Sequence, residues 1–73
     1  MKVPDKFPEG CRFGERSEGG FFVEFPDGKW FKLSDDGESL EFCKYLDSRG
    51  PTSEWWERSE SAFRAEIAEL AAA

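Results

Sequence analysis

The chain of 73 residues contains no histidine, the side chain that most often acts as a general base or a metal ligand. Its two cysteines, Cys11 and Cys43, therefore have no histidine to activate them as nucleophiles. Two cysteines without histidine also do not complete a closed zinc site within one chain. No glycine-rich phosphate-binding motif occurs. We expect a protein that is not an enzyme, with no catalytic residues, no metal and no cofactor.

Long apolar runs are also missing. No segment approaches the roughly 20 apolar residues that a membrane-spanning helix needs. The first residues, Met1 to Lys6, lack the apolar stretch of a signal peptide. Two cysteines are too few for a secreted miniprotein held together by disulfides. These absences favour a cytoplasmic protein with reduced thiols and no membrane association.

The chain has fewer basic than acidic residues. Ten lysines and arginines face sixteen acidic residues, which gives a net charge of -6. Binding to nucleic acid depends on basic side chains that contact phosphates, and anionic membrane surfaces repel an acidic protein. We therefore expect no direct binding to nucleic acid. The acidity is compatible with a basic protein partner, and it also keeps a small protein soluble.

Aromatic residues, by contrast, are abundant: eight phenylalanines, three tryptophans and one tyrosine. A chain of this length buries only about 60% of the surface that its unfolded form exposes, so its core must come from a few large side chains. This composition predicts one small folded domain over residues 1–73. Residues 1–10 contain two prolines and a glycine and are expected to form an extended arm, pinned by Phe7.

The clearest local signal is the run Phe-Pro-Asp-Gly-Lys at residues 25–29. Pro26 presets the backbone for the first turn position, and Gly28 supplies the left-handed residue of a three-residue hairpin loop. Such a loop fixes the register of the strands on either side. It predicts five opposed pairs: Phe25–Lys29, Glu24–Trp30, Val23–Phe31, Phe22–Lys32 and Phe21–Leu33.

A second turn, Ser-Glu-Gly at residues 17–19, can take the same form. It predicts three opposed pairs: Arg12–Glu24, Phe13–Val23 and Gly14–Phe22. The two registers agree on which residues share a face, so we predict a three-stranded antiparallel β-meander over 11–34. One face of this meander is apolar: Phe13, Phe21, Val23, Phe31 and Leu33.

Residues 39–49 are compatible with two structures. The length of the segment and the Gly50-Pro51 pair that follows it favour a short helix. The alternation of Leu40 and Phe42 instead allows a fourth strand.

The last segment is predicted to be a C-terminal α-helix over 53–71, packed on the sheet. Thr52 or Ser53 can cap its N-terminus. An apolar stripe recurs at helical spacing through Trp56, Phe63, Ile67 and Leu70. Two ion pairs at a spacing of four residues support it: Glu54–Arg58 and Glu60–Arg64. The predicted fold class is therefore α+β.

The second face of the meander gathers aromatic rings among charges: Arg12, Phe22, Glu24, Trp30 and Lys32. Arg12 can pair with Glu24 across the strands, and Phe22 can cover the gap left by Gly14. Exposed rings framed by charges are typical of a protein interface. Trp55, at the edge of the helical stripe, either extends this predicted partner-binding site or packs against the Gly50-Pro51 turn. The alternative is that the helix at 39–49 or the N-terminal arm covers the face.

These features favour a small, acidic, non-catalytic protein-interaction module of bacterial or phage character. A second hypothesis is an acidic inhibitor that occupies the basic groove of a nucleic-acid-binding protein. Small phage inhibitors that mimic nucleic acid are similar in size and acidity, although no motif is shared. The predicted acidic helix face would serve this role: Glu54, Glu57, Glu60, Glu66 and Glu69. A third hypothesis is a homodimer that covers the second sheet face.

Overall fold

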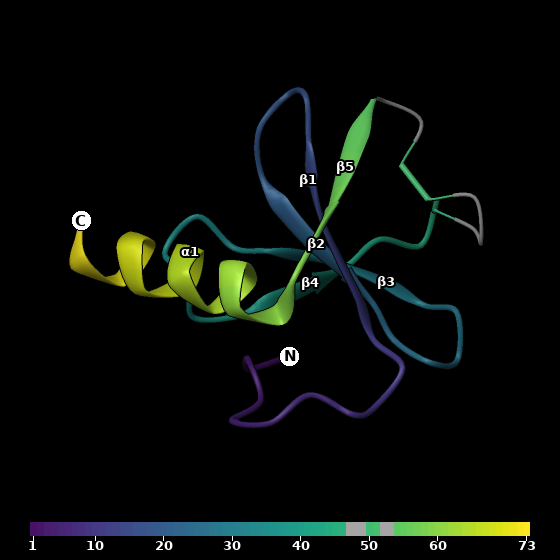
Figure 1. Cartoon of the computed structure of the whole chain (residues 1–73), viewed down its shortest axis with the longest axis horizontal. Helices are drawn as coiled ribbons and strands as arrows, with labels where there is room; N and C mark the ends of the chain where they lie inside the picture. Colours follow the sequence, from purple (N-terminus) through teal and green to yellow (C-terminus); the bar gives the residue numbers. More distant parts are fainter. Residues whose placement is uncertain (47–49, 52–53) are drawn as a thin grey trace.

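The computed structural model describes residues 1–46, 50–51 and 54–73. These residues form one antiparallel five-stranded sheet in the order β4-β3-β2-β1-β5, followed by one helix. The elements are β1 (Arg12–Arg16), β2 (Phe21–Glu24), β3 (Trp30–Leu33), β4 (Leu40–Phe42), β5 (Trp55–Arg58) and α1 (Glu60–Ala72). Figure 1 shows the chain passing directly from β5 into α1. The α+β class is confirmed, with five strands where three were predicted.

The register of the first three strands agrees with the prediction. Strand β1 pairs with β2 through Arg12–Glu24, Phe13–Val23 and Gly14–Phe22, and strand β2 pairs with β3 through Phe22–Lys32, Val23–Phe31 and Glu24–Trp30. Both turns have the expected chemistry, since Gly19 and Gly28 have positive φ angles of 94° and 87°. Two local turns therefore determine the alignment of the central strands.

The described part of the segment 39–49 contains a strand, β4, and no helix, so the favoured helix is wrong and the fourth strand is correct. Strand β4 pairs with β3 through Leu33–Leu40 and Phe31–Phe42. The physical cause is the preceding turn, where the Asp36 carboxylate accepts hydrogen bonds from Ser34 Oγ (2.6 Å) and Glu38 N (2.9 Å). The bond from Ser34 lowers the pKa of Asp36. These contacts close a hairpin instead of starting a helix.

The C-terminal helix begins seven positions later than predicted, at Glu60 instead of 53. Ser59 is its N-cap and accepts a hydrogen bond from Ala62 N at 3.1 Å; the predicted caps Thr52 and Ser53 lie outside the described residues. The Glu60–Arg64 pair forms at 3.9 Å, whereas the other predicted helical pair, Glu54–Arg58, lies in and next to a strand.

Residues 55–58 form strand β5, which pairs with β1 through four opposed pairs: Phe13–Arg58, Gly14–Glu57, Glu15–Trp56 and Arg16–Trp55. The outer edge of β1 would otherwise present unpaired backbone groups. Aromatic residues such as the two adjacent tryptophans favour strands. Pairing along β1 thus takes precedence over helix formation in this segment.

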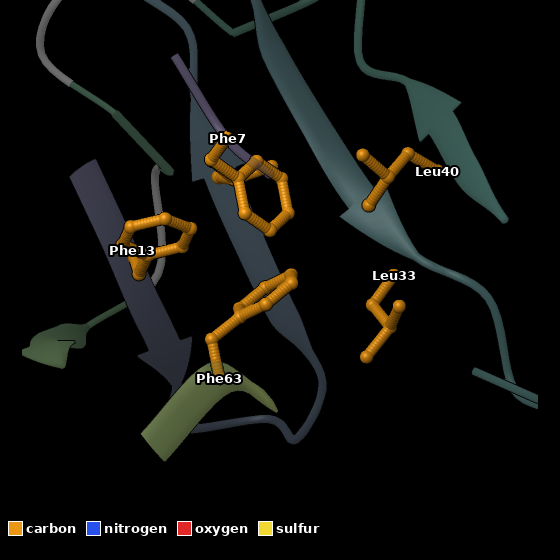
Figure 2. Packing of buried hydrophobic residues seen from close by; sticks show 6 residues of the cluster. Phe7, Phe13, Leu33, Leu40 and Phe63 are labelled. Atoms are coloured by element: carbon orange, nitrogen blue, oxygen red, sulfur yellow. The ribbon is translucent and has the colours of Figure 1, made fainter. Parts of the chain in front are cut away.

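The first core lies on the face of the sheet that was predicted to be apolar. Its buried residues come from the sheet, the arm and the helix: Phe7, Phe13, Val23, Leu33, Leu40 and Phe63. The ring of Phe63 lies 5.1 Å from that of Phe13 and 5.6 Å from that of Phe7. Figure 2 shows Phe63 pointing from α1 into the space between Phe13 and Leu33. The arm and helix together cover this face, and Phe7 pins the arm as expected.

The N-terminal residues also cap one edge of the sheet. The terminal ammonium group of Met1 donates to Leu40 O at 2.7 Å, and Leu40 N donates to Met1 O at 2.6 Å. Lys2 forms an antiparallel bridge with Ser39. The outer edge of β4 is therefore hydrogen-bonded to the protein's own arm.

Replacing Phe63 with alanine is expected to lower the free energy of unfolding by about 3–5 kcal/mol, because its buried ring leaves a cavity. Chemical denaturation followed by circular dichroism measures the change. Phe63→Leu is a milder variant in case the alanine protein does not fold, with an expected loss of about 1.5 kcal/mol or less. Phe42→Ala removes an exposed ring and is the control. An equal loss in Phe63→Ala and Phe42→Ala would contradict this packing.

Candidate functional site

The second face of the sheet is covered by the protein itself. Phe22 and Trp30 are each 1% exposed, and they form a second core together with Cys43. Leu46 and Trp55, both partly buried, pack against this core. The prediction that this face binds a partner is therefore wrong, because its two central rings, Phe22 and Trp30, are inaccessible to a partner. The alternative, a covered face, is correct.

In the described part of the chain, this cover comes from residues between β4 and β5, and not from a helix or from the arm. Cys43 and Leu46 follow directly after β4 and pack onto the second core. Gly50 approaches the core so closely that an added Cβ would lie 3.4 Å from both Trp30 Cζ2 and Trp55 Nε1. Its φ angle of 83° also favours glycine. The backbone of Gly50 thus packs directly against the indole rings of Trp30 and Trp55.

Gly14 makes this second core possible. A Cβ at this position would lie 2.8 Å from Phe22 Cζ and 2.9 Å from Trp55 Cε3, closer than real contacts allow. The prediction that Phe22 covers the gap left by Gly14 is confirmed, and Trp55 covers it as well. Trp55 lies 5.5 Å from Phe22 and 6.0 Å from Trp30, measured between ring centroids.

Charged side chains form the rim of this core. The Arg12 guanidinium donates to Glu57 Oε1 at 3.1 Å and to Glu24 Oε1 at 3.2 Å, and it lies 5.5 Å from the Trp55 ring centroid. The hydrogen bond to Glu57 is the largest contribution to the raised pKa of Arg12. The predicted Arg12–Glu24 pair is therefore present, and β5 supplies a third member that the sequence did not indicate.

A surface cavity of about 510 Å³ lies at the end of the sheet next to the β1–β2 turn. Arg16 Nη2 and Lys32 Nζ each lie 3.9 Å from the position of a Cβ on Gly20. Neither cation has an ion-pair partner among the described residues, and Arg16 Nε is buried without a hydrogen-bond acceptor there. Three acidic side chains line the same cavity: Glu18, Asp35 and Glu66. They outnumber the two cations, so the cavity offers no net attraction for an anion.

The exposed aromatic side chains of the described residues lie elsewhere. Trp56 on β5 is 44% exposed, Phe42 on β4 is 56% exposed and Tyr45 is 72% exposed. The prediction that Trp56 belongs to the core is wrong, because it lies on a strand. The Arg58 guanidinium lies 6.0 Å from the Trp56 ring and 3.3 Å from Glu15 Oε2. Trp56 is thus an accessible indole with a charged neighbour.

The outer edge of β5 is open in the described structure. Ser17 N donates to Glu54 O at 2.7 Å, in the same register as the β1–β5 pairs. Because hydrogen-bonded pairs alternate in an antiparallel ladder, Trp56 and Arg58 bond to β1, while the backbones of Trp55 and Glu57 point outward. No other described segment pairs with this edge.

The predicted acidic helix face is divided between two elements. Glu54 and Glu57 lie in or beside β5, and only the other three glutamates lie on α1: Glu60, Glu66 and Glu69. The pKa of Glu66 is raised by its partial burial and then by repulsion from Glu69 and Glu15. The nucleic-acid-mimicking hypothesis thus loses the continuous acidic surface that motivated it.

The cysteines occupy different cores. Cys11 packs against the first core and Cys43 belongs to the second, and both are free thiols. Partial burial raises the pKa of each thiol. Among the described residues, no group of three or more Cys, Asp or Glu side chains is arranged to hold a metal ion.

Comparison with known proteins gives no relative: no family model, no curated protein and no solved structure matches the chain. In the described residues, no helix has the length and apolar character required to span a bilayer.

Gly14→Ala is expected to lower the free energy of unfolding by about 1–3 kcal/mol, because the methyl group would push Phe22 and Trp55 apart. Gly14 does not have a positive φ angle, so without these rings the same change should stabilise the protein by about 0.4–1 kcal/mol. The sign of the change, measured by chemical denaturation, tests the contact. Glu15→Ala, on the opposite face of β1, is the control and should change stability by about 1 kcal/mol or less.

Both thiols should react with Ellman's reagent more slowly in the folded than in the denatured protein, because a raised pKa leaves less thiolate. Cys11 is partly exposed and should react before the buried Cys43. Cys11→Ser should remove the faster phase and Cys43→Ser the slower one. Equal rates for the two thiols would contradict a closed second core.

Proposed function

We propose that the protein is a small, non-catalytic interaction module that binds a partner protein by strand addition along the outer edge of β5. The observation that carries this proposal is the difference between the two sheet edges. Strand β4 is hydrogen-bonded to the protein's own arm, whereas the outward backbone groups of Trp55 and Glu57 have no strand beside them in the described chain. Such an edge is a template for an extended segment of another chain.

The side chains of β5 supply the selectivity of this edge. Alternate residues of a strand point to opposite faces, so Trp56 and Arg58 lie on the face that α1 covers, and Trp55 and Glu57 lie on the other. An apolar residue of the added strand would pack against the exposed Trp56 ring. Indole side chains often dominate the binding energy of protein interfaces.

The residues predicted as contacts acquire different roles in this proposal. Phe22 and Trp30 hold Trp55 in place from within the second core. Arg12 and Glu24 orient Glu57 from the neighbouring strands. Lys32 lies on β3, separated from β5 by two strands, and has no part in the proposed contact.

The test is a selection of short peptides from a random library, followed by NMR mapping on the labelled protein. Selected peptides should bind in an extended form, perturb the amides of residues 54–58 and slow the hydrogen exchange of the Trp55 and Glu57 amides. Trp56→Ala should weaken this binding about tenfold or more. Tyr45→Ala and Phe42→Ala remove comparably exposed rings and should leave it unchanged. Peptides that bind elsewhere, or binding equally sensitive to all three changes, would reject the proposal.

A further inference from the structure

We infer that the strand that pairs with β5 is β5 of a second copy, placed antiparallel about a two-fold axis that passes between the two Trp56 residues. This inference rests on the proposed use of the β5 edge and names its partner. It predicts one continuous ten-stranded sheet in the dimer, with five strands from each copy.

The backbone of β5 permits this pairing. Hydrogen-bonded pairs across the new junction must join residues whose N–H and C=O groups point outward, which are Trp55 and Glu57. An axis at Trp56 places Trp55 of one copy opposite Glu57 of the other, and the reverse. Both outward residues of each strand thereby obtain partners.

The side chains of β5 are complementary to themselves in the same register. Trp56 faces Trp56 of the second copy in a non-hydrogen-bonded pair, the type that brings side chains closest. Two residues away on the same face, Arg58 of each copy lies opposite Glu54 of the other. The junction therefore contains one pair of indole rings between two pairs of opposite charges.

The two neighbouring registers, with the axis at Trp55 or at Glu57, are less favourable, because each separates Glu54 from Arg58. Moving the axis to Glu57 keeps the backbone pattern but places two Glu57 carboxylates directly opposite each other. Like charges at opposed positions destabilise a strand pair. The same shift replaces both Glu54–Arg58 pairs with contacts between Arg58 and Trp56. Charge complementarity therefore selects the axis at Trp56.

Helix α1 leaves room for the second copy. Helix α1 starts directly after β5, packs through Phe63 on the first core, and then runs toward the β3–β4 turn. There an added Cβ on Gly37 would lie 3.0 Å from Ile67 O and 3.1 Å from Leu70 Cβ. The helix therefore extends away from the outer edge of β5, the edge that does not face β1 (Figure 1).

The contact is short, five residues from each copy, and buries less than the roughly 1,200 Å² typical of stable complexes. We expect a weak dimer, with a dissociation constant of about 100 μM. Sedimentation equilibrium of the full chain over a concentration series that extends about tenfold above this value measures it. A protein that stays monomeric throughout overturns the second copy as partner, and binding of selected peptides to β5 remains a separate measurement.

A charge exchange tests the register. Arg58→Glu alone and Glu54→Arg alone each create two like-charge contacts and should weaken the dimer about tenfold or more. An equimolar mixture of the two variants should restore association, because every facing pair is again of opposite charge. Glu41→Arg and Lys44→Glu make matched charge changes away from β5 and should leave the native dimer unchanged.

Two further results test the proposed register of the two β5 strands. Native association without restoration in the mixture overturns the axis at Trp56. Trp56→Thr keeps a residue that favours strands and should also weaken the dimer about tenfold, which provides a second test should either charge variant fail to fold. Unchanged association in Trp56→Thr overturns the pairing of the two indole rings.

Discussion

The missing side chain at Gly14 is the feature on which the rest of the structure depends. Because no Cβ occupies this place, the rings of Phe22 and Trp55 lie directly against β1. Trp55 is thereby fixed beside Phe22 and Trp30, and β5 is held along β1. The second core, the fifth strand and the open edge all follow from this contact.

A short chain with rings on both faces of its sheet must cover both faces with little material. The arm and α1 cover the first core, and three described residues between β4 and β5 cover the second: Cys43, Leu46 and Gly50. The arm also pairs with β4 through Met1 and Lys2. Within the described chain no further element is left to cover the last strand. The edge of β5 is thus left open by the residues that the structure describes.

The turn residues predicted the part of the fold that the turns determine. The turns closed by Gly19 and Gly28 set the register of three strands, and that register is observed. Strand β5 depends on pairing with β1, some forty residues away, which no local pattern encodes. One signal was nevertheless available: two adjacent tryptophans cannot share a helical stripe, whereas in a strand they point to opposite faces. Trp55 enters the second core and Trp56 stays exposed on the other face.

The charges on β5 explain how such an edge can be both open and selective. Natural proteins protect exposed edges by keeping them short and charged, because an apolar edge would pair with almost any extended chain. Glu54, Glu57 and Arg58 provide this protection, since an arbitrary strand can place like charges opposite them. Only a strand with opposite charges in the reverse order satisfies them, and Glu54 and Arg58, placed symmetrically about Trp56, make β5 itself such a strand. The same side chains thus discourage indiscriminate pairing and favour one antiparallel partner.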